Sequence, residues 1–169
     1  MSPEENKALV SRFNEEVFGK RNLAAIDEYI TPDQIDHSLP SSLPNTREGT
    51  RQAIAMTLKA FPDLNFQVED MIADGDKVVT RYITRGTQQG PFGPIPPTRK
   101  RVAVSGIVVT RIADGKIVEQ WGLDDRLAML QQLGLIPALF GFIFFAGFTA
   151  GMGLIAVLRT VLKKSQVLS

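Results

Sequence analysis

Two adjacent carboxylates, Asp124 and Asp125, follow the only tryptophan, Trp121, at the end of the last predicted strand. A carboxylate held in an apolar pocket has a raised pKa and can remove a proton from an activated carbon atom. This residue type therefore suits acid/base chemistry that uses neither a metal nor an organic cofactor. Capping of a predicted helix over 126–133 is an alternative role for Asp125, and capping does not exclude catalysis.

His37 is the single histidine of the chain and lies in the proline-containing segment 31–40. An imidazole titrates near neutral pH, so His37 is a candidate to orient a substrate or to carry a proton. A structural hydrogen bond that holds this segment is the alternative. Trp121, Tyr82 and Phe13 are candidates for the wall of an apolar pocket, although each would equally serve as a core residue.

Helices are predicted in the first part of the chain. A Ser-x-x-Glu capping box that starts at Ser2 opens a helix that runs to about Lys20. Further helices are expected over 23–30 and 46–60 because their apolar residues recur at helical spacing. The segment 31–40 between them is expected to be irregular.

Strands are predicted after Pro62, where the hydrophobic period changes to two. One hairpin joins 64–72 to 77–87 and the other joins 101–112 to 116–123, and both turn on the same four residues, Ile-Ala-Asp-Gly. Helices followed by a four-stranded antiparallel meander indicate an α+β fold. Three helices over a curved sheet leave a concave face, where ligands usually bind.

The composition excludes several function classes. The chain has no cysteine and one histidine, so a thiol nucleophile, a disulfide and a His-rich metal centre are all excluded. The net charge is only +1, and its basic excess lies at the C-terminal end, which gives no reason to expect nucleic acid as a partner. The acidic N-terminus lacks the apolar stretch of a signal peptide.

The C-terminal segment is unlike the rest of the chain. Residues 127–158 carry no charge, and 135–158 are long and apolar enough to cross a bilayer as one helix. Gly147 and Gly151 have the spacing that permits close helix pairing in lipid. We therefore expect a single-pass anchor, with a basic tail beyond it and the globular domain, 1–134, on the cytoplasmic side. A buried helix or an oligomer-forming tail in a soluble assembly is the alternative.

Two sequence elements carry a resemblance to a known family. They are Phe61-Pro62-Asp63-Leu64, between helix and sheet, and the hairpin 112–121, which ends in Glu-Gln-Trp. Together they resemble the SnoaL-like polyketide cyclases (ester cyclases), a branch of the cone-shaped α+β barrel fold named after nuclear transport factor 2. The resemblance runs from about Asn6 to Pro137. It implies a deep apolar pocket and a homodimer or higher homo-oligomer, and it implies no cofactor.

The same resemblance suggests roles for particular residues. Aligned on the ending Leu-Gln-Gln-Leu-Gly at 130–134, Asp125 falls on the position of an aspartate that acts as general acid/base in ring closure by aldol chemistry. His37 matches an Asp-His element of the family. Two positions depart from the family pattern, because Gln88 and Gln120 stand where members often have histidine. Glutamine forms hydrogen bonds but does not titrate.

These observations predict an enzyme that acts on a small hydrophobic carbonyl or polyketide-like compound. Asp125 and His37 would be its catalytic groups. Its substrate-binding groups would be Trp121, Gln120, Gln88, Tyr82 and Phe13. The two glutamines favour the alternative, a non-catalytic, membrane-tethered binding module for an apolar small molecule.

Overall fold

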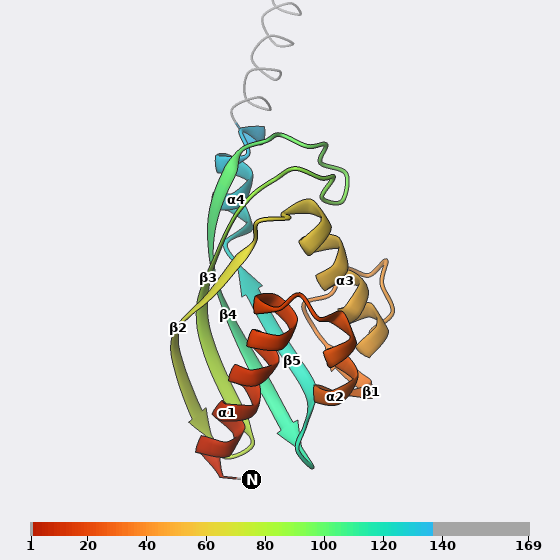
Figure 1. Cartoon of the computed structure of the whole chain (residues 1–169), viewed down its shortest axis with the longest axis vertical. Coiled ribbons are helices and arrows are strands. Elements are labelled where there is room, and N and C mark those ends of the chain that lie inside the picture. The colour runs from red at the N-terminus through yellow and green to blue at the C-terminus, as the bar shows by residue number, and fades with distance from the viewer. Residues whose placement is uncertain (1, 137–169) are drawn as a thin grey trace, which may run out of the picture. The chain divides into compact units, whose positions relative to one another are not determined.

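The computed structural model describes residues 2–136, and its first compact unit ends at Leu133 (Figure 1). The helical elements are α1 (Pro3–Asn14), the π-helix η1 (Glu15–Gly19), the 3₁₀-helix η2 (Leu23–Ala25), α2 (Ile26–Tyr29), α3 (Arg47–Ala60) and α4 (Arg126–Gln132). The strands are β1 (Ile30–Asp36), β2 (Asn65–Asp74), β3 (Lys77–Thr87), β4 (Arg101–Ala113) and β5 (Lys116–Asp124). The predicted α+β class is confirmed.

The capping box at the start of α1 is confirmed. The Glu5 backbone N–H donates to Ser2 Oγ at 3.2 Å, and the Ser2 backbone nitrogen donates to Glu5 Oε2 at 2.6 Å. Pro3 occupies the first turn, where its missing N–H costs nothing. The helix continues beyond α1 as the π-turn η1, so the predicted run to about Lys20 is present with a change of pitch at Glu15.

The sheet has five strands in the order β1-β5-β4-β3-β2, and β1 pairs with β5 in parallel. The prediction of a four-stranded antiparallel sheet and an irregular segment 31–40 is therefore wrong at β1. The inward side chains of this strand include Gln34 and Asp36, which are polar although they are buried, so hydropathy gave no strand signal. Its Pro32 is tolerated because β1 is an edge strand.

One face of the sheet, which we call the inner face, is covered by the N-terminal helices (Figure 1). Alternate strand residues such as Val78, Ile112 and Ile117 are buried there against α1 and α2. The helical contribution to this core comes from Leu9, Val10, Phe13, Val17 and Ile26. Intervening strand residues point to the opposite, outer face, which no described element covers.

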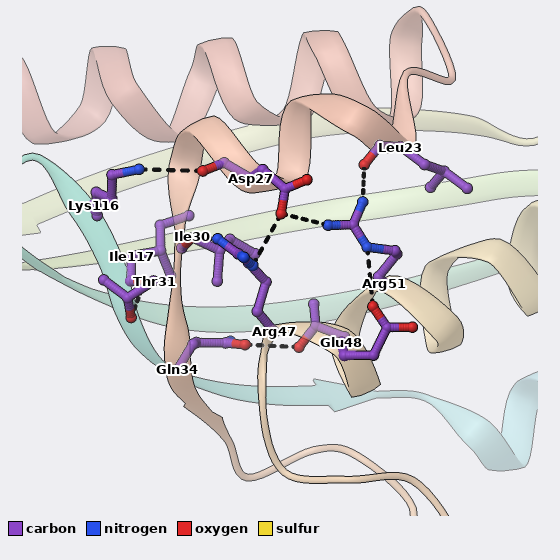
Figure 2. Close-up of polar contacts among 11 residues, drawn as sticks. Leu23, Asp27, Ile30, Thr31, Gln34, Arg47, Glu48, Arg51, Lys116 and Ile117 are labelled. Carbon is purple, nitrogen blue, oxygen red and sulfur yellow. Dashed lines mark hydrogen bonds and ion pairs between the residues drawn. The ribbon is translucent and has the colours of Figure 1, made fainter.

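A polar cluster around Asp27 ties the helices to the edge strand (Figure 2). The Asp27 carboxylate forms ion pairs with Arg47 at 3.1 Å and with Arg51 at 2.6 Å, so α2 is joined to two turns of α3. Arg47 also donates to the Ile30 carbonyl oxygen at the start of β1. Because Asp27 is half exposed, these contacts orient the elements more than they stabilise them. They hold β1 in place with Gln34 directed inward.

Among residues 2–136, no helix has both the length and the apolar character needed to cross a bilayer. The predicted membrane span, 135–158, lies outside the described residues from position 137 onward. The anchor therefore stays a prediction.

Candidate functional site

Tyr82, Gly106 and Asp124 lie side by side on the inner face, in one row across β3, β4 and β5. Strand register pairs Tyr82 with Gly106 and Gly106 with Asp124. The phenol hydroxyl of Tyr82 donates to Asp124 Oδ1 at 2.7 Å, across the intervening glycine. The row therefore brings a hydrogen-bond donor and a carboxylate together at the end of the sheet where α4 begins.

Gly106 provides the space for this contact. A Cβ atom at position 106 would lie 2.5 Å from Tyr82 Cζ and 2.6 Å from both Tyr82 Oη and Asp124 Oδ1. Contacts that short do not occur between real side chains, so any larger residue would displace the pair. The glycine is thus required by the tyrosine–aspartate contact itself.

The environment of Tyr82 keeps its hydroxyl protonated. The residue is only 8% exposed, and burial raises the pKa of the phenol far above its ordinary value. The carboxylates of Asp124 and Asp36 raise the pKa further, because both disfavour a second negative charge nearby. Tyr82 is therefore a hydrogen-bond donor at any physiological pH.

An aromatic stack adjoins the pair. The Tyr82 ring stacks on Phe66 with centroids 4.6 Å apart, and Phe66 stacks on Phe18 at 4.7 Å. Phe18 belongs to η1, so the π-turn directs an aromatic ring onto the sheet. This side of the site can contact an apolar or planar ligand.

A second carboxylate, Asp36, lies at the end of β1 on the inner face and is buried. It accepts from the Ser38 backbone N–H at 2.9 Å and from Ser38 Oγ at 2.5 Å. Ser38 in turn lies against Gly122, where a Cβ atom would be 3.1 Å from Ser38 Oγ. A second glycine thus admits polar atoms to the sheet surface, next to the Tyr82–Asp124 row.

A chain of uncharged side chains lies deeper on the inner face. Thr50 Oγ1 donates to Gln34 Oε1 at 2.8 Å, Gln34 Nε2 donates to Gln120 Oε1 at 3.0 Å, and Gln120 Nε2 contacts Thr110 Oγ1 at 3.4 Å. All four residues are buried. Gln120, predicted to bind substrate, is therefore part of a hydrogen-bonded chain that links α3 and β1 to β5 and β4.

His37 and Trp121 are brought together, but on the outer face. Their rings stack with centroids 5.1 Å apart, and His37 Nε2 lies 2.9 Å from Glu119 Oε1. Arg111 donates to the other oxygen of Glu119 at 2.9 Å. Hydrogen bonds from His37 and then Arg111 hold the pKa of Glu119 below its ordinary value. The predicted histidine and tryptophan thus lie on the opposite side of the sheet from Tyr82 and Gln120.

Asp125 caps α4. Its Oδ1 accepts from the Ala128 backbone N–H at 2.8 Å, which is the alternative role considered for this residue, whereas the Tyr82 hydroxyl donates to Asp124. The structure therefore separates the two members of the acidic pair, one onto the sheet and one onto the helix.

Gln88 and Phe13 each have a structural role in this fold. The Gln88 amide donates towards the carbonyl oxygens of Gly90, Ile95 and Pro96 and accepts from Thr98, so it fastens the loop between β3 and β4. Phe13 is a core residue that packs edge-on against Phe18 and Tyr29. Neither residue lies in the row that contains Asp124.

Sequence reasoning missed the roles of Asp36, Ser38, Gly106 and Phe66. One sequence signal could have indicated which residues share a face. Side chains alternate along a strand, so Gln120, Gly122 and Asp124 lie on one face of the sheet and Trp121 lies on the other. The contact across Gly106 depends on the register of three strands and has no local signal. Within residues 2–136 no group of three or more His, Cys, Asp or Glu side chains is arranged to hold a metal ion.

Comparison with known proteins identifies relatives of this chain. The family model described as SnoaL-like polyketide cyclase matches residues 8–133. TsrD from Streptomyces laurentii is 26% identical, with a TM-score of 0.73 over 80% of this chain and 98% of that one. IdmH from Streptomyces antibioticus, described as a candidate polyketide cyclase, is 34% identical, with a TM-score of 0.64 over 79% of this chain and 99% of that one.

A candidate polyketide cyclase from Bacillus cereus is 30% identical, with a TM-score of 0.67 over 80% of this chain and 86% of that one. A search of curated proteins finds no match. The matched region includes every residue of the Tyr82–Asp124 row and both glutamines that depart from the family pattern. The chain belongs to the SnoaL-like polyketide cyclase family.

Proposed function

We propose that this protein is a cofactor-free acid/base enzyme that closes a ring in, or isomerises, a small hydrophobic compound with neighbouring carbonyl groups. The observation that carries the proposal is the Tyr82–Asp124 contact of 2.7 Å on the inner face. Membership of the SnoaL-like family and the aromatic stack beside the pair support the substrate class.

In the proposed reaction Asp124 is the base. Its Oδ1 accepts the Tyr82 hydrogen bond, which orients the carboxylate and leaves Oδ2 for the substrate. Oδ2 takes a proton from a carbon between two carbonyl groups, and the resulting enolate carbon bonds to a ketone carbon of the same molecule. The proton then returns from Asp124 to the new alkoxide oxygen. Atoms and charge balance without an oxidant, a reductant or a metal.

The family resemblance assigns the acid/base role to Asp125, and the geometry favours Asp124, so matched variants decide between them. The substrates are linear β-keto esters that can close a ring by an intramolecular aldol reaction, with products followed by mass spectrometry. We expect Asp124→Asn to lower turnover by about 100-fold or more. Asp125→Asn keeps a helix cap, because asparagine caps as well as aspartate, and should retain activity. The reverse result would give the role to Asp125.

A non-catalytic binding module is the second candidate. Gln120 favours it, because this position often carries histidine in the family and here holds an amide whose hydrogen bonds are internal. Retention of an apolar ligand through purification, seen by native mass spectrometry, together with no turnover of any β-keto ester, would favour this candidate over the enzyme.

Pairing of two copies through the outer face is a further proposal. Ile72, Val79, Val109 and Trp121 lie in one row across four strands, and Leu123 beside them is 78% exposed. An exposed apolar row of this kind is typical of subunit interfaces. Light scattering of the full chain should report a dimer that Leu123→Glu dissociates, whereas Met56→Glu, on exposed α3, should leave it intact. A monomeric wild-type chain would contradict the pairing.

The C-terminal anchor is proposed on hydropathy alone, from the uncharged run over 135–158. Cell fractionation tests it, and recovery of the full chain in the soluble fraction without detergent would contradict it. Protease treatment of intact cells tests the cytoplasmic position of the globular domain, because a cytoplasmic domain is protected.

A further inference from the structure

A basic surface lies at the end of the molecule where the first compact unit finishes. Figure 1 shows the loop between β3 and β4 at the same end as the last turn of α4. Two hydrogen bonds join that turn to β4. The Ala103 N–H donates to Gln132 Oε1 at 2.7 Å, and Gln132 Nε2 donates to the Ala103 carbonyl oxygen at 2.9 Å. The unit ends at Leu133, so the start of β4 lies next to the point where the chain leaves it.

A run of basic residues stands just before Ala103. Arg99, Lys100 and Arg101 are consecutive and exposed, and none of them takes part in an ion pair within residues 2–136. The sequence from 77 to 113 contains no acidic residue, so β3, β4 and the loop between them carry only positive charges. A surface of one sign attracts a partner of the opposite sign.

Asp63 is the acidic group that approaches this run, and it is already engaged. Its two carboxylate oxygens accept from the Thr87 N–H at 2.6 Å and from Thr87 Oγ1 at 2.7 Å. These bonds lower the pKa of Asp63 most, and the charge of Arg101 lowers it least. Asp63 therefore offsets at most the charge of Arg101 and leaves Arg99 and Lys100 available.

The backbone that carries the basic run is fixed. The Gln88 N–H donates to the Lys100 carbonyl oxygen, and the Arg99 N–H donates to the Gln88 carbonyl oxygen, both at 2.9 Å. The buried side chain of Gln88 accepts from Thr98 and so holds the residue before the run. A backbone that is already ordered loses little entropy when its side chains bind a partner.

The position of this surface along the chain indicates what it faces. Only Gly134 separates Leu133 from the predicted membrane span, 135–158, and one residue reaches at most about 3.6 Å. The headgroup layer on each side of a bilayer is about 5–7 Å thick. A span that starts at 135 therefore holds the last turn of α4 at the headgroups. The basic run, two residues before Ala103, then lies at the same level.

We propose that Arg99, Lys100 and Arg101 bind anionic lipid headgroups and hold the globular unit against the membrane. The inference rests on the proposed anchor and goes beyond it, because an apolar anchor requires no lipid charge. Each lysine or arginine close to an anionic bilayer raises the affinity by about fivefold. The arginines add paired hydrogen bonds to phosphate oxygens. Nucleic acid fits less well, because proteins that bind it typically neutralise about 6–10 phosphates.

The test measures how close this surface lies to a bilayer. The chain has no cysteine, so one introduced cysteine places a fluorophore at one position. Gln89→Cys labels an exposed position beside the basic run, and Asp76→Cys labels an exposed position at the other end of β3. The labelled full chain is reconstituted with vesicles whose headgroups carry a quencher. The lipid is phosphatidylcholine, alone or with about one third phosphatidylserine.

We expect phosphatidylserine to increase the quenching at position 89 and to leave that at position 76 unchanged. Salt should reverse the increase, because it screens exposed charges. Replacing Arg99 and Lys100 together by glutamine should lower the equilibrium constant for docking on the anionic bilayer by about 25-fold. The control, Lys7→Gln with Arg12→Gln, removes the same two charges from α1 and should leave the quenching unchanged. Urea unfolding checks that both variants fold.

Three results would overturn the proposal. Equal quenching at position 89 in the two lipid mixtures would mean that the surface does not recognise anionic lipid. Equal losses in the test and control variants would mean that only net charge matters. Binding of an oligonucleotide that the Arg99 and Lys100 variant loses, without a response to phosphatidylserine, would make this a nucleic-acid surface.

The anchor and the basic surface can fail separately. Cell fractionation tests the anchor alone. A chain recovered without detergent whose label at position 89 still responds to phosphatidylserine, and loses that response in the Arg99 and Lys100 variant, would remove the anchor and support the surface. An anchored chain whose label does not respond would remove the surface and leave the anchor.

Discussion

The two faces of the sheet use neighbouring residues of the same strands in opposite ways. On the inner face Asp36 and Gln120 are buried, and the side chains around them form hydrogen bonds without ion pairs. On the outer face their sequence neighbours His37 and Trp121 are exposed and lie with Glu119 in a charged cluster. Residues that are adjacent in a strand therefore belong to different sites.

This difference indicates on which face the stability of the fold depends on individual hydrogen-bonding side chains. A buried donor or acceptor that loses its partner costs about 1–3 kcal/mol, since water cannot replace the lost bond. An exposed ion pair is replaced by water and contributes little. Changes on the inner face should therefore be larger than changes on the outer face, and the following variants test that order.

The largest effect is expected for Gly106→Ala. Its Cβ would overlap Tyr82 and Asp124, so the variant should lose about 1–3 kcal/mol of unfolding free energy. It should also lose the ring-closing activity, because the Tyr82–Asp124 hydrogen bond cannot form. Urea unfolding and turnover of the β-keto esters measure both effects. Gly19→Ala is the control, since its nearest contact is an ordinary 3.7 Å. An active, fully stable Gly106→Ala would contradict the geometry of the row.

A loss of stability in the same range, with no loss of ring closure predicted beside it, is expected when the buried amide chain is cut. Gln120→Leu removes the partner of Gln34 Nε2 and should cost about 1–3 kcal/mol, measured by urea unfolding. The double variant with Gln34→Leu should cost less than the sum of the two single variants, because both members of one buried bond are removed together.

The matched control for that series is Gln52→Leu, the same substitution at an exposed position of α3. It should change stability by no more than about 0.5 kcal/mol. Equal losses from Gln120→Leu and Gln52→Leu would mean that the inner face is no more sensitive than the surface.

The smallest effect is expected on the outer face, at Glu119. Its pKa is lowered in the folded state by His37 and Arg111. A lowered folded-state pKa contributes stability above the unfolded-state pKa, and this contribution is lost as pH falls through the folded-state value. The melting temperature of the wild type should thus fall more steeply than that of Glu119→Gln between about pH 5 and about pH 3. Parallel pH profiles would show that the cluster does not stabilise the fold.

Local signals in the sequence predicted most of the fold. The capping box at Ser2 and the two Asp-Gly turns are complete within a few residues, and the elements they delimit are present. The strand β1 was not predicted, because its partner is distant in sequence and its buried Gln34 and Asp36 are polar. A strand whose inward residues form hydrogen bonds has no hydrophobic alternation to detect.

The candidate site was predicted less completely, for a related reason. The acidic pair was recognised from the sequence. What distinguishes Asp124 from Asp125 is its contact with Tyr82 across Gly106, and this contact depends on the register of β3, β4 and β5. Trp121 and Gln120 were both predicted to bind substrate, whereas alternation along β5 assigns them to opposite faces. The family resemblance suggested which residue types to look for. It did not indicate that Asp124, rather than Asp125, contacts Tyr82.

The parallel pairing of β1 with β5 has a consequence for the order in which the chain folds. Each hairpin closes a turn of a few residues, whereas the contact between Thr31 and Ile117 joins positions 86 residues apart. Closing such a loop costs more chain entropy, so we expect the hairpins to form early and the edge strand to dock late. Asp36, Ser38 and Gln34 would then reach the inner face only in the last step. A folding intermediate of this protein would have its meander and its tyrosine–aspartate contact before its second carboxylate arrives.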